Sequence, residues 1–167
     1  MLPHLDSAHN LARWILRDER DAEDVTQEAC LRAYQFFEGF RGGNAKAWLL
    51  AIVRNTSATW LEKNRRREMS PFDEEVHGAP DGPAPSVSEA PGPEAALLQS
   101  ADREMVQRAL EELPAAYREA LVLRELEGLS YKEISAVAEV PLGTVMSRLS
   151  RAREQLRRDL IERVGRQ

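Results

Sequence analysis

The sequence SYKEISAVAEVPLGTVMSRLSRAREQL, residues 130–156, decides the fold of the C-terminal half of the chain. Ser130 followed by Glu133 is a capping-box pattern, which predicts the start of a short helix. The segment VPLG interrupts the helical pattern, and a basic helix is expected from about residue 144 to 161. A short helix, a tight turn and a longer basic helix together predict a helix-turn-helix motif.

The second helix of this motif separates apolar from polar residues. One side is expected to be buried and carries Val145, Leu149, Ala152, Leu156 and Leu160. The opposite side carries Ser147, Ser150, Arg151, Glu154 and Arg158. Serines let a helix backbone approach a DNA groove, and arginines reach base edges or phosphates. The alternative is a solvated amphipathic helix, but the coincidence of capping box, turn and serines favours DNA binding.

Two further helices are expected before this motif. The first extends from about residue 94 to 113, and Pro114 suits the first position of the second. The apolar stripe expected for the second helix is Ala116, Ala120, Leu123 and Leu126. Gly128 is expected to end it.

The N-terminal part of the chain predicts three helices. Asp6 is expected to cap a helix ending near Arg17, and Asp21 the next. Asn44 is expected to cap a long helix ending near Asn64. No segment alternates with a period of two, so the fold class is predicted to be all-α.

Acidic residues concentrate in the middle of the chain. The net charge of the whole chain is −5. Residues 68–112 carry a charge of −9, so the rest of the chain carries +4. The run HGAPDGPAPSVSEAPGP is rich in Pro, Gly, Ser and Ala and predicts a flexible linker. The expected organisation is therefore two small helical domains, 1–67 and 94–167, joined by an acidic linker, 68–93.

Composition argues against several classes of protein. The single cysteine, Cys30, cannot close a disulfide within the chain and is expected to be a small buried residue. No apolar run is long enough to span a bilayer, so we expect no membrane insertion and a cytoplasmic location. The three histidines fit no catalytic or metal-binding pattern, so we expect no enzyme activity, no metal and no cofactor.

The long N-terminal helix ends in a basic cluster with aromatic neighbours. Residues 54–67 carry a charge of +4, and Phe40, Trp48 and Trp60 lie nearby. Cations with aromatic rings suit single-stranded nucleic acid, where bases stack on the rings. The alternative, which we favour for the two tryptophans, is that the rings belong to the core.

The C-terminal sequence from residue 113 to 156 resembles region 4 of extracytoplasmic-function (ECF) sigma factors. Within it, PLGTVMSRLSRAR is similar to the helix that reads the −35 promoter element. The resemblance implies six contacts to −35 DNA: Thr144, Met146, Ser147, Arg148, Ser150 and Arg151. Many members carry a basic residue at the position of Met146, where this chain could instead contact a thymine methyl.

The N-terminal sequence resembles region 2 of the same family. DAEDVTQEACLRAYQFF is similar to region 2.2, which implies polymerase contacts by Asp24, Gln27, Glu28 and Arg32. FRGGNAKAWLLAIVRNTSATWLEKNRRR is similar to regions 2.3 and 2.4, which read and open the −10 element. The implied −10 residues are Arg41, Asn44, Lys46, Asn55, Lys63 and Arg65.

The resemblance implies a non-catalytic subunit that directs promoter-specific transcription initiation. The implied partners are core RNA polymerase, through its β′ clamp helices and β flap, promoter DNA and an anti-sigma factor. Three rivals remain open from the residues alone. They are a helix-turn-helix regulator that binds its operator as a dimer, an enzyme, and a helical adaptor.

Overall fold

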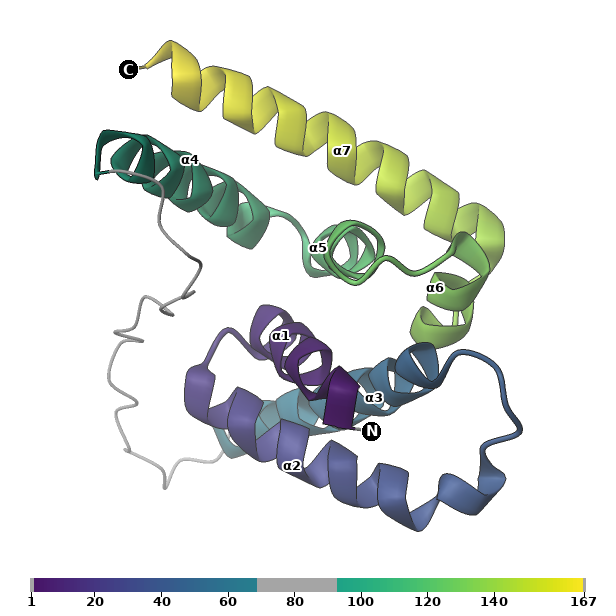
Figure 1. Ribbon diagram of the computed structural model, residues 1–167. Coiled ribbons are helices and arrows are strands. Elements are labelled where there is room, and N and C mark those ends of the chain that lie inside the picture. Colours follow the sequence, from purple (N-terminus) through teal and green to yellow (C-terminus); the bar gives the residue numbers. More distant parts are fainter. Residues whose placement is uncertain (1, 69–92, 167) are drawn as a thin grey trace.

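The computed structural model describes residues 2–68 and 93–166, and every regular element in these ranges is helical (Figure 1). The all-α prediction is therefore confirmed. The predicted linker, apart from its end residues Glu68 and Pro93, lies outside the described residues. In the described parts of the chain, no helix is both long and apolar enough to cross a membrane.

Three helices form the N-terminal domain: α1 (Leu5–Leu16), α2 (Glu19–Gln35) and α3 (Ala45–Glu68). Short 3-10 turns precede α1 (η1, Leu2–His4) and follow α2 (η2, Phe37–Gly39). All three helices pack against one another. Alanines supply much of the buried surface of α1 and α2, and such small side chains let the helices approach closely: Ala8, Ala12, Ala22, Ala29 and Ala33.

One of the three predicted N-terminal caps is confirmed. The Asn44 side-chain oxygen accepts from the Ala47 N–H at 3.3 Å, at the start of α3. The cap predictions for Asp6 and Asp21 are wrong. The chain is already helical before Asp6, and Asp18 caps α2 by accepting from the Asp21 N–H at 3.0 Å. Asp18 has the extended backbone that an N-cap needs, whereas Asp21 is already within the helix.

Four α-helices form the C-terminal domain: α4 (Pro93–Glu112), α5 (Ala115–Leu121), α6 (Tyr131–Ala138) and α7 (Leu142–Gly165). A π-helical turn, η3 (Val122–Leu126), extends α5. The wider π turn, closed by the hydrogen bond from the Glu127 N–H to the Val122 carbonyl, changes the direction of the side chains within it from that in an α-helix. Leu126, predicted to be buried, is consequently 53% exposed, while Leu121 and Val122 are buried.

A buried arginine joins α4 to α5. The Arg118 side chain donates to the carbonyl oxygens of Glu111 at 2.9 Å and Leu113 at 3.3 Å. The Glu111 carbonyl lies in the last turn of α4 and the Leu113 carbonyl just beyond its end, where carbonyls lack the next turn as a partner, so Arg118 supplies a donor to both. Burial, together with the nearby charge of Arg17, lowers the pKa of Arg118.

The two domains pack against each other. Helices α1 and α3 of the first domain contact α5, η3 and α6 of the second (Figure 1). Apolar residues from both domains belong to one continuous buried cluster. The sequence predicts two domains but does not predict this contact between them.

Candidate nucleic-acid interface

Helices α6 and α7 form the predicted helix-turn-helix, and both capping-box hydrogen bonds are present. The Glu133 N–H donates to Ser130 Oγ at 3.1 Å, and the Ser130 N–H donates to Glu133 Oε1 at 2.9 Å. Glu139 then ends α6 in the left-handed region, with φ of 55°. The Ser135 hydroxyl donates to the Val140 carbonyl at 2.5 Å, which closes the turn into α7.

Helix α7, the second helix of this motif, has one buried and one exposed face. Val145, Leu149 and Ala152 are each about 1% exposed or less. Of the six residues assigned to −35 DNA, four are exposed: Met146, Ser147, Ser150 and Arg151. These four residues give α7 an exposed face with two small serines, one arginine and one methionine, side chains that can contact phosphates and base edges in a DNA groove.

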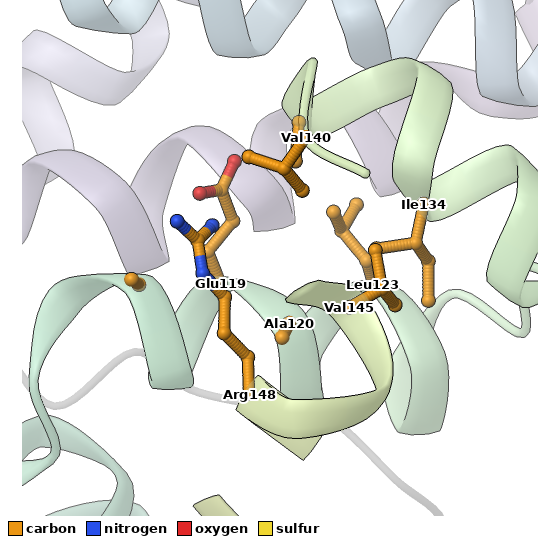
Figure 2. Close-up of a pocket in the computed structure, with 9 residues that line it drawn as sticks. Glu119, Ala120, Leu123, Ile134, Val140, Val145 and Arg148 are labelled. Atoms are coloured by element: carbon orange, nitrogen blue, oxygen red, sulfur yellow. The ribbon is translucent and has the colours of Figure 1, made fainter. Parts of the chain in front are cut away.

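The other two assigned residues, Thr144 and Arg148, are half-buried. Arg148 lines a small pocket between α5, α6 and α7, together with Glu119, Leu123 and Ile134. Figure 2 shows the guanidinium of Arg148 and the carboxylate of Glu119 on the same side of this pocket. With a volume of about 10 Å³, the pocket is too small for a nucleotide or a cofactor. Arg148 thus lies apart from the exposed face of α7.

Arg153 on the flank of α7 is held by its own domain. Its guanidinium lies 2.8 Å from Glu125 Oε1. The hydrogen bond that Arg153 donates to Glu125, and a further one with Tyr131, raise the pKa of Arg153. The structure therefore distinguishes Arg151, which is exposed, from Arg153, which is paired.

The predicted polymerase-binding residues lie along one side of α2. Asp24 and Gln27 are exposed. Glu28 and Arg32 form an ion pair of 2.7 Å, and Arg32 also donates to Thr56 Oγ1 of α3 at 3.4 Å. Arg32 therefore both flanks this surface and links α2 to α3.

Sequence analysis missed the apolar part of the α2 surface. Leu31 is 64% exposed and Tyr34 is 76% exposed, and Phe36 and Phe37 continue the patch. Exposed apolar groups gathered in this way mark interaction surfaces. The signal was available in the sequence, because Leu31 lies three and four residues beyond Glu28 and Gln27.

An aromatic cluster shapes the loop between α2 and α3. The Trp48 ring lies 5.1 Å from Phe40 and 6.4 Å from Phe37, measured between ring centroids. Gly42 and Gly43, both with positive φ, then turn the chain toward Asn44. The exposed Arg41 is presented by this loop. Trp48 and Trp60 pack against the core, as the favoured interpretation expected.

The residues assigned to the −10 site divide into two groups. Asn55, Lys63 and Arg65 are exposed on α3, as is Arg41 in the loop. Asn44 and Lys46 instead contact the C-terminal domain. The Asn44 amide donates to Glu133, and Lys46 Nζ lies 3.2 Å from Glu127 Oε2 and donates to the Glu127 carbonyl at 2.7 Å.

One group of potential metal ligands occurs in the described part of the chain. Ligand atoms of His9, Glu19 and Glu23 lie within 4.8 Å of one another. Arg13, however, lies 3.5 Å from Glu19, and both carboxylates are exposed. An arginine at this distance supplies the positive charge that a metal ion would otherwise provide. Cys30 is only half-buried rather than fully buried, and burial raises the pKa of its thiol.

Comparison with known proteins places both domains in one family. Residues 2–67 match the model of sigma-70 region 2, and residues 103–156 match that of sigma-70 region 4. The chain is 39% identical over 137 residues to the ECF RNA polymerase sigma-E factor of Escherichia coli K12, covering 81% of this chain and 72% of the relative. It is 36% identical over 154 residues to ECF RNA polymerase sigma factor SigE of Mycolicibacterium smegmatis, covering 92% of this chain and 57% of the relative.

Solved structures resemble the whole arrangement. The sigma factor RpoE in complex with the anti-sigma factor NepR from Bartonella quintana matches with a TM-score of 0.72 and 30% identity, over 95% of this chain and 92% of that one. CnrH in complex with the cytosolic domain of CnrY matches with a TM-score of 0.62 and 25% identity, over 96% of this chain and 84% of that one. With two family regions in order and a relative of this identity, the chain belongs to the ECF group of the sigma-70 family and is an RNA polymerase sigma factor.

Proposed function

We propose that this sigma factor holds a promoter with two surfaces while a third binds core RNA polymerase. The exposed face of α7 would enter the major groove of duplex DNA at −35. Arg41, Asn44, Lys46 and Asn55 would hold unpaired DNA at −10, with Lys63 and Arg65 near the duplex backbone. The α2 surface would dock on the β′ clamp helices.

The observation that carries this proposal is the division of α7 into two faces. Val145, Leu149 and Ala152 anchor the helix on its own domain, so the opposite face stays available to a partner. That face presents Ser147, Ser150 and the arginine of position 151 to solvent. Serine and arginine side chains of this kind contact phosphates and base edges.

Polymerase docking is supported by the composition of the α2 surface. The acidic and amide groups of Asp24, Gln27 and Glu28 lie one and two turns before the exposed Leu31 on α2, and Tyr34 lies one turn after it. A polar rim around exposed apolar side chains is typical of a protein–protein interface. Arg32 would supply the basic group at its edge.

The remaining assignments belong to the same proposal. The domains would comprise residues 1–67 and 94–167, with 68–93 as the acidic linker. The C-terminal domain would also meet the β flap, and an anti-sigma factor would bind the chain, as NepR binds RpoE in the similar complex. The protein would act in the cytoplasm and catalyse no reaction, since polymerase makes every bond.

Run-off transcription with purified core polymerase on a pool of genomic fragments tests the function. We expect specific initiation at a subset of fragments that share −35 and −10 sequences, and none when this chain is omitted. A helix-turn-helix regulator acting as a dimer would instead bind its operator without polymerase and would leave residues 2–67 unexplained. Failure to initiate at any fragment would contradict the proposal.

A further inference from the structure

The first two turns of α7, at the end of the helix that lies beside α6, carry two exposed apolar side chains (Figure 1). Leu142 is 41% exposed and Met146 is 53% exposed. Because they lie four residues apart, both side chains are on the same side of the helix, one turn from each other. The serines and arginine of the exposed face do not explain why apolar groups are presented here.

Gly143 lies between these two residues along the chain, and nothing in the protein requires it to be glycine. Its backbone lacks the positive φ that favours glycine, and a Cβ atom built on it would meet nothing within 4 Å among the described residues. Glycine is also less favourable than alanine within a helix. A missing side chain at this point instead suits the close approach of an external partner to the helix backbone.

The same two turns present no exposed cation. Within residues 142–149, all of which the structure describes, the only charged residue is Arg148. It is half-buried and lines the small pocket together with Glu119 (Figure 2). The first exposed arginine of α7 is Arg151. The beginning of the helix is therefore uncharged on its exposed side.

These side chains limit which bases the beginning of α7 can recognise. In the major groove, guanine is read by Arg or Lys, adenine by Asn or Gln, and cytosine by Asp or Glu. None of these residue types is among the exposed residues of the segment 142–147, which are Leu142, Gly143, Met146 and Ser147. Serine bonds to more than one base and does not decide the choice. Thymine offers an apolar group, its C5-methyl, which apolar side chains contact.

We propose that Leu142 and Met146 determine −35 specificity by contacting thymine methyl groups, and that Gly143 lets the beginning of the helix lie close to the bases. The inference rests on the proposed function, because it concerns the DNA that the exposed face of α7 would enter. The two apolar residues lie about 6 Å apart along the helix axis, at about 1.5 Å per residue. This is close to two base-pair steps of about 3.4 Å, so the two thymines are expected within about two base pairs of each other.

The variants separate this apolar contact from other properties of α7. Met146→Ala and Leu142→Ala each shorten one exposed side chain, whereas Met146→Arg introduces a side chain that reads guanine. Ile161→Ala is the matched control, because Ile161 is an apolar residue of the same helix and is 60% exposed. It lies about 22 Å from Met146 along the helix axis, beyond the width of a major groove of about 12 Å. Circular dichroism checks that each variant keeps its helices and its melting temperature.

Holoenzyme assembled from core polymerase and the full chain is first used to select −35 sequences from a randomised promoter pool. Each thymine of the selected −35 element is then replaced by deoxyuridine, which lacks only the C5-methyl group. We expect two of these replacements to weaken holoenzyme binding about fourfold each, which corresponds to the loss of one buried methyl group. Filter binding at fixed salt measures the change.

The variants should remove this discrimination one position at a time. At one of the two positions, Met146→Ala should bind thymine and uracil equally, and Met146→Arg should prefer guanine. Leu142→Ala should lose the discrimination at the other position, and Ile161→Ala should behave as the wild type. Gly143→Ala should weaken binding at −35 without lowering the melting temperature.

Tolerance of uracil at every −35 thymine would overturn the proposal, as would an equal loss of discrimination in Ile161→Ala. Weaker binding of Met146→Ala to core polymerase without DNA would also overturn it, because the apolar pair would then be a polymerase contact. If the holoenzyme selects no sequence, the proposed function fails and this inference fails with it. If it selects promoters whose −35 thymines all tolerate uracil, the proposed function stands and only this inference fails.

Discussion

The two helices that we propose to bind DNA, α3 and α7, differ in how many of their polar side chains are paired within the protein itself. On α7, Ser147, Ser150 and Arg151 face solvent, and the nearest cation with an acidic partner is Arg153 on the flank. On α3, Lys46 and Arg54 are both paired with carboxylates of the other domain. One surface is open in the free chain, while the other is partly covered.

This difference follows from where the supporting contacts lie. Helix α7 is anchored within its own domain by its apolar face, so its polar face needs no further partner. Helix α3 is central to the N-terminal bundle but also adjoins the C-terminal domain, where Glu119 of α5 and Glu127 after η3 pair with its cations. Replacing a polar residue of α7 should therefore affect DNA binding alone. Replacing a cation of α3 should affect both DNA binding and the contact between the domains.

The largest expected effect is the loss of stability when a buried residue that anchors α7 on its own domain is truncated. Leu149→Ala removes a side chain that is 1% exposed, so we expect the free energy of unfolding to fall by about 2–5 kcal/mol. Urea denaturation followed by circular dichroism measures this. Leu126→Ala is the control, since Leu126 is 53% exposed and should change stability by less than about 0.5 kcal/mol. Equal losses would mean that the burial of the two leucines is wrongly assigned.

A smaller loss is expected from the buried arginine that joins α4 to α5. Arg118→Ala leaves the carbonyls of Glu111 and Leu113 without their donor and should destabilise the protein by about 2–3 kcal/mol. Denaturation at neutral pH checks this value. Arg157→Ala, at an exposed position of α7, is the matched control and should have little effect. A stability loss below that of the control would contradict the role of Arg118 as a cap of α4.

The comparison between the two surfaces is sharpened by removing one cation from each. Arg151→Ala should weaken holoenzyme binding at −35 by roughly 1–3 kcal/mol and relax base preference there. Lys46→Ala should weaken promoter binding less, because Lys46 is already paired with Glu127 and is therefore less available for the DNA contact that we propose. Filter binding at fixed salt, with a scan of −35 and −10 bases, measures both. Arg153→Ala should leave −35 selectivity unchanged, and a loss equal to that of Arg151→Ala would contradict the assignment of the exposed face.

The smallest expected effect concerns pH. Hydrogen bonds from Ser130 lower the pKa of Glu133 from 4.5, and the Asn44 amide adds to this. Because the folded pKa lies below the unfolded one, this contribution to stability is present above about pH 4.5 and is lost as pH falls through the folded pKa. We expect a decrease of about 1 kcal/mol or less between pH 6 and pH 3 from this group.

Glu133→Gln separates that contribution from others. Glutamine still accepts a hydrogen bond at the third position of the capping box, so the helix should remain while its share of the pH dependence disappears. Glu112, whose pKa is lowered by Arg163, should keep contributing. An unchanged pH profile in Glu133→Gln would show that the Glu133 carboxylate does not titrate with folding.

Much of the fold could be predicted because it depends on short-range signals. Ser130 and Glu133 lie three residues apart, and the stripe Val145, Leu149, Ala152 follows the helical repeat, so both predictions are confirmed. Where a competing local signal existed, prediction failed. Asp18 was preferred over Asp21 as a cap, and the π turn of η3 rotated Leu126 into solvent.

The sequence by itself determined the all-α class, the helix-turn-helix and the family, since each is encoded in residues close together along the chain. Only the tertiary structure decided which lysines and arginines are exposed to solvent and which are paired with carboxylates of the other domain. Lys46 and Glu127 are 81 residues apart, and Arg54 and Glu119 are 65 apart. No local periodicity or cap relates such residues, because their pairing depends on how two domains pack. That packing separates the open face of α7 from the partly covered face of α3.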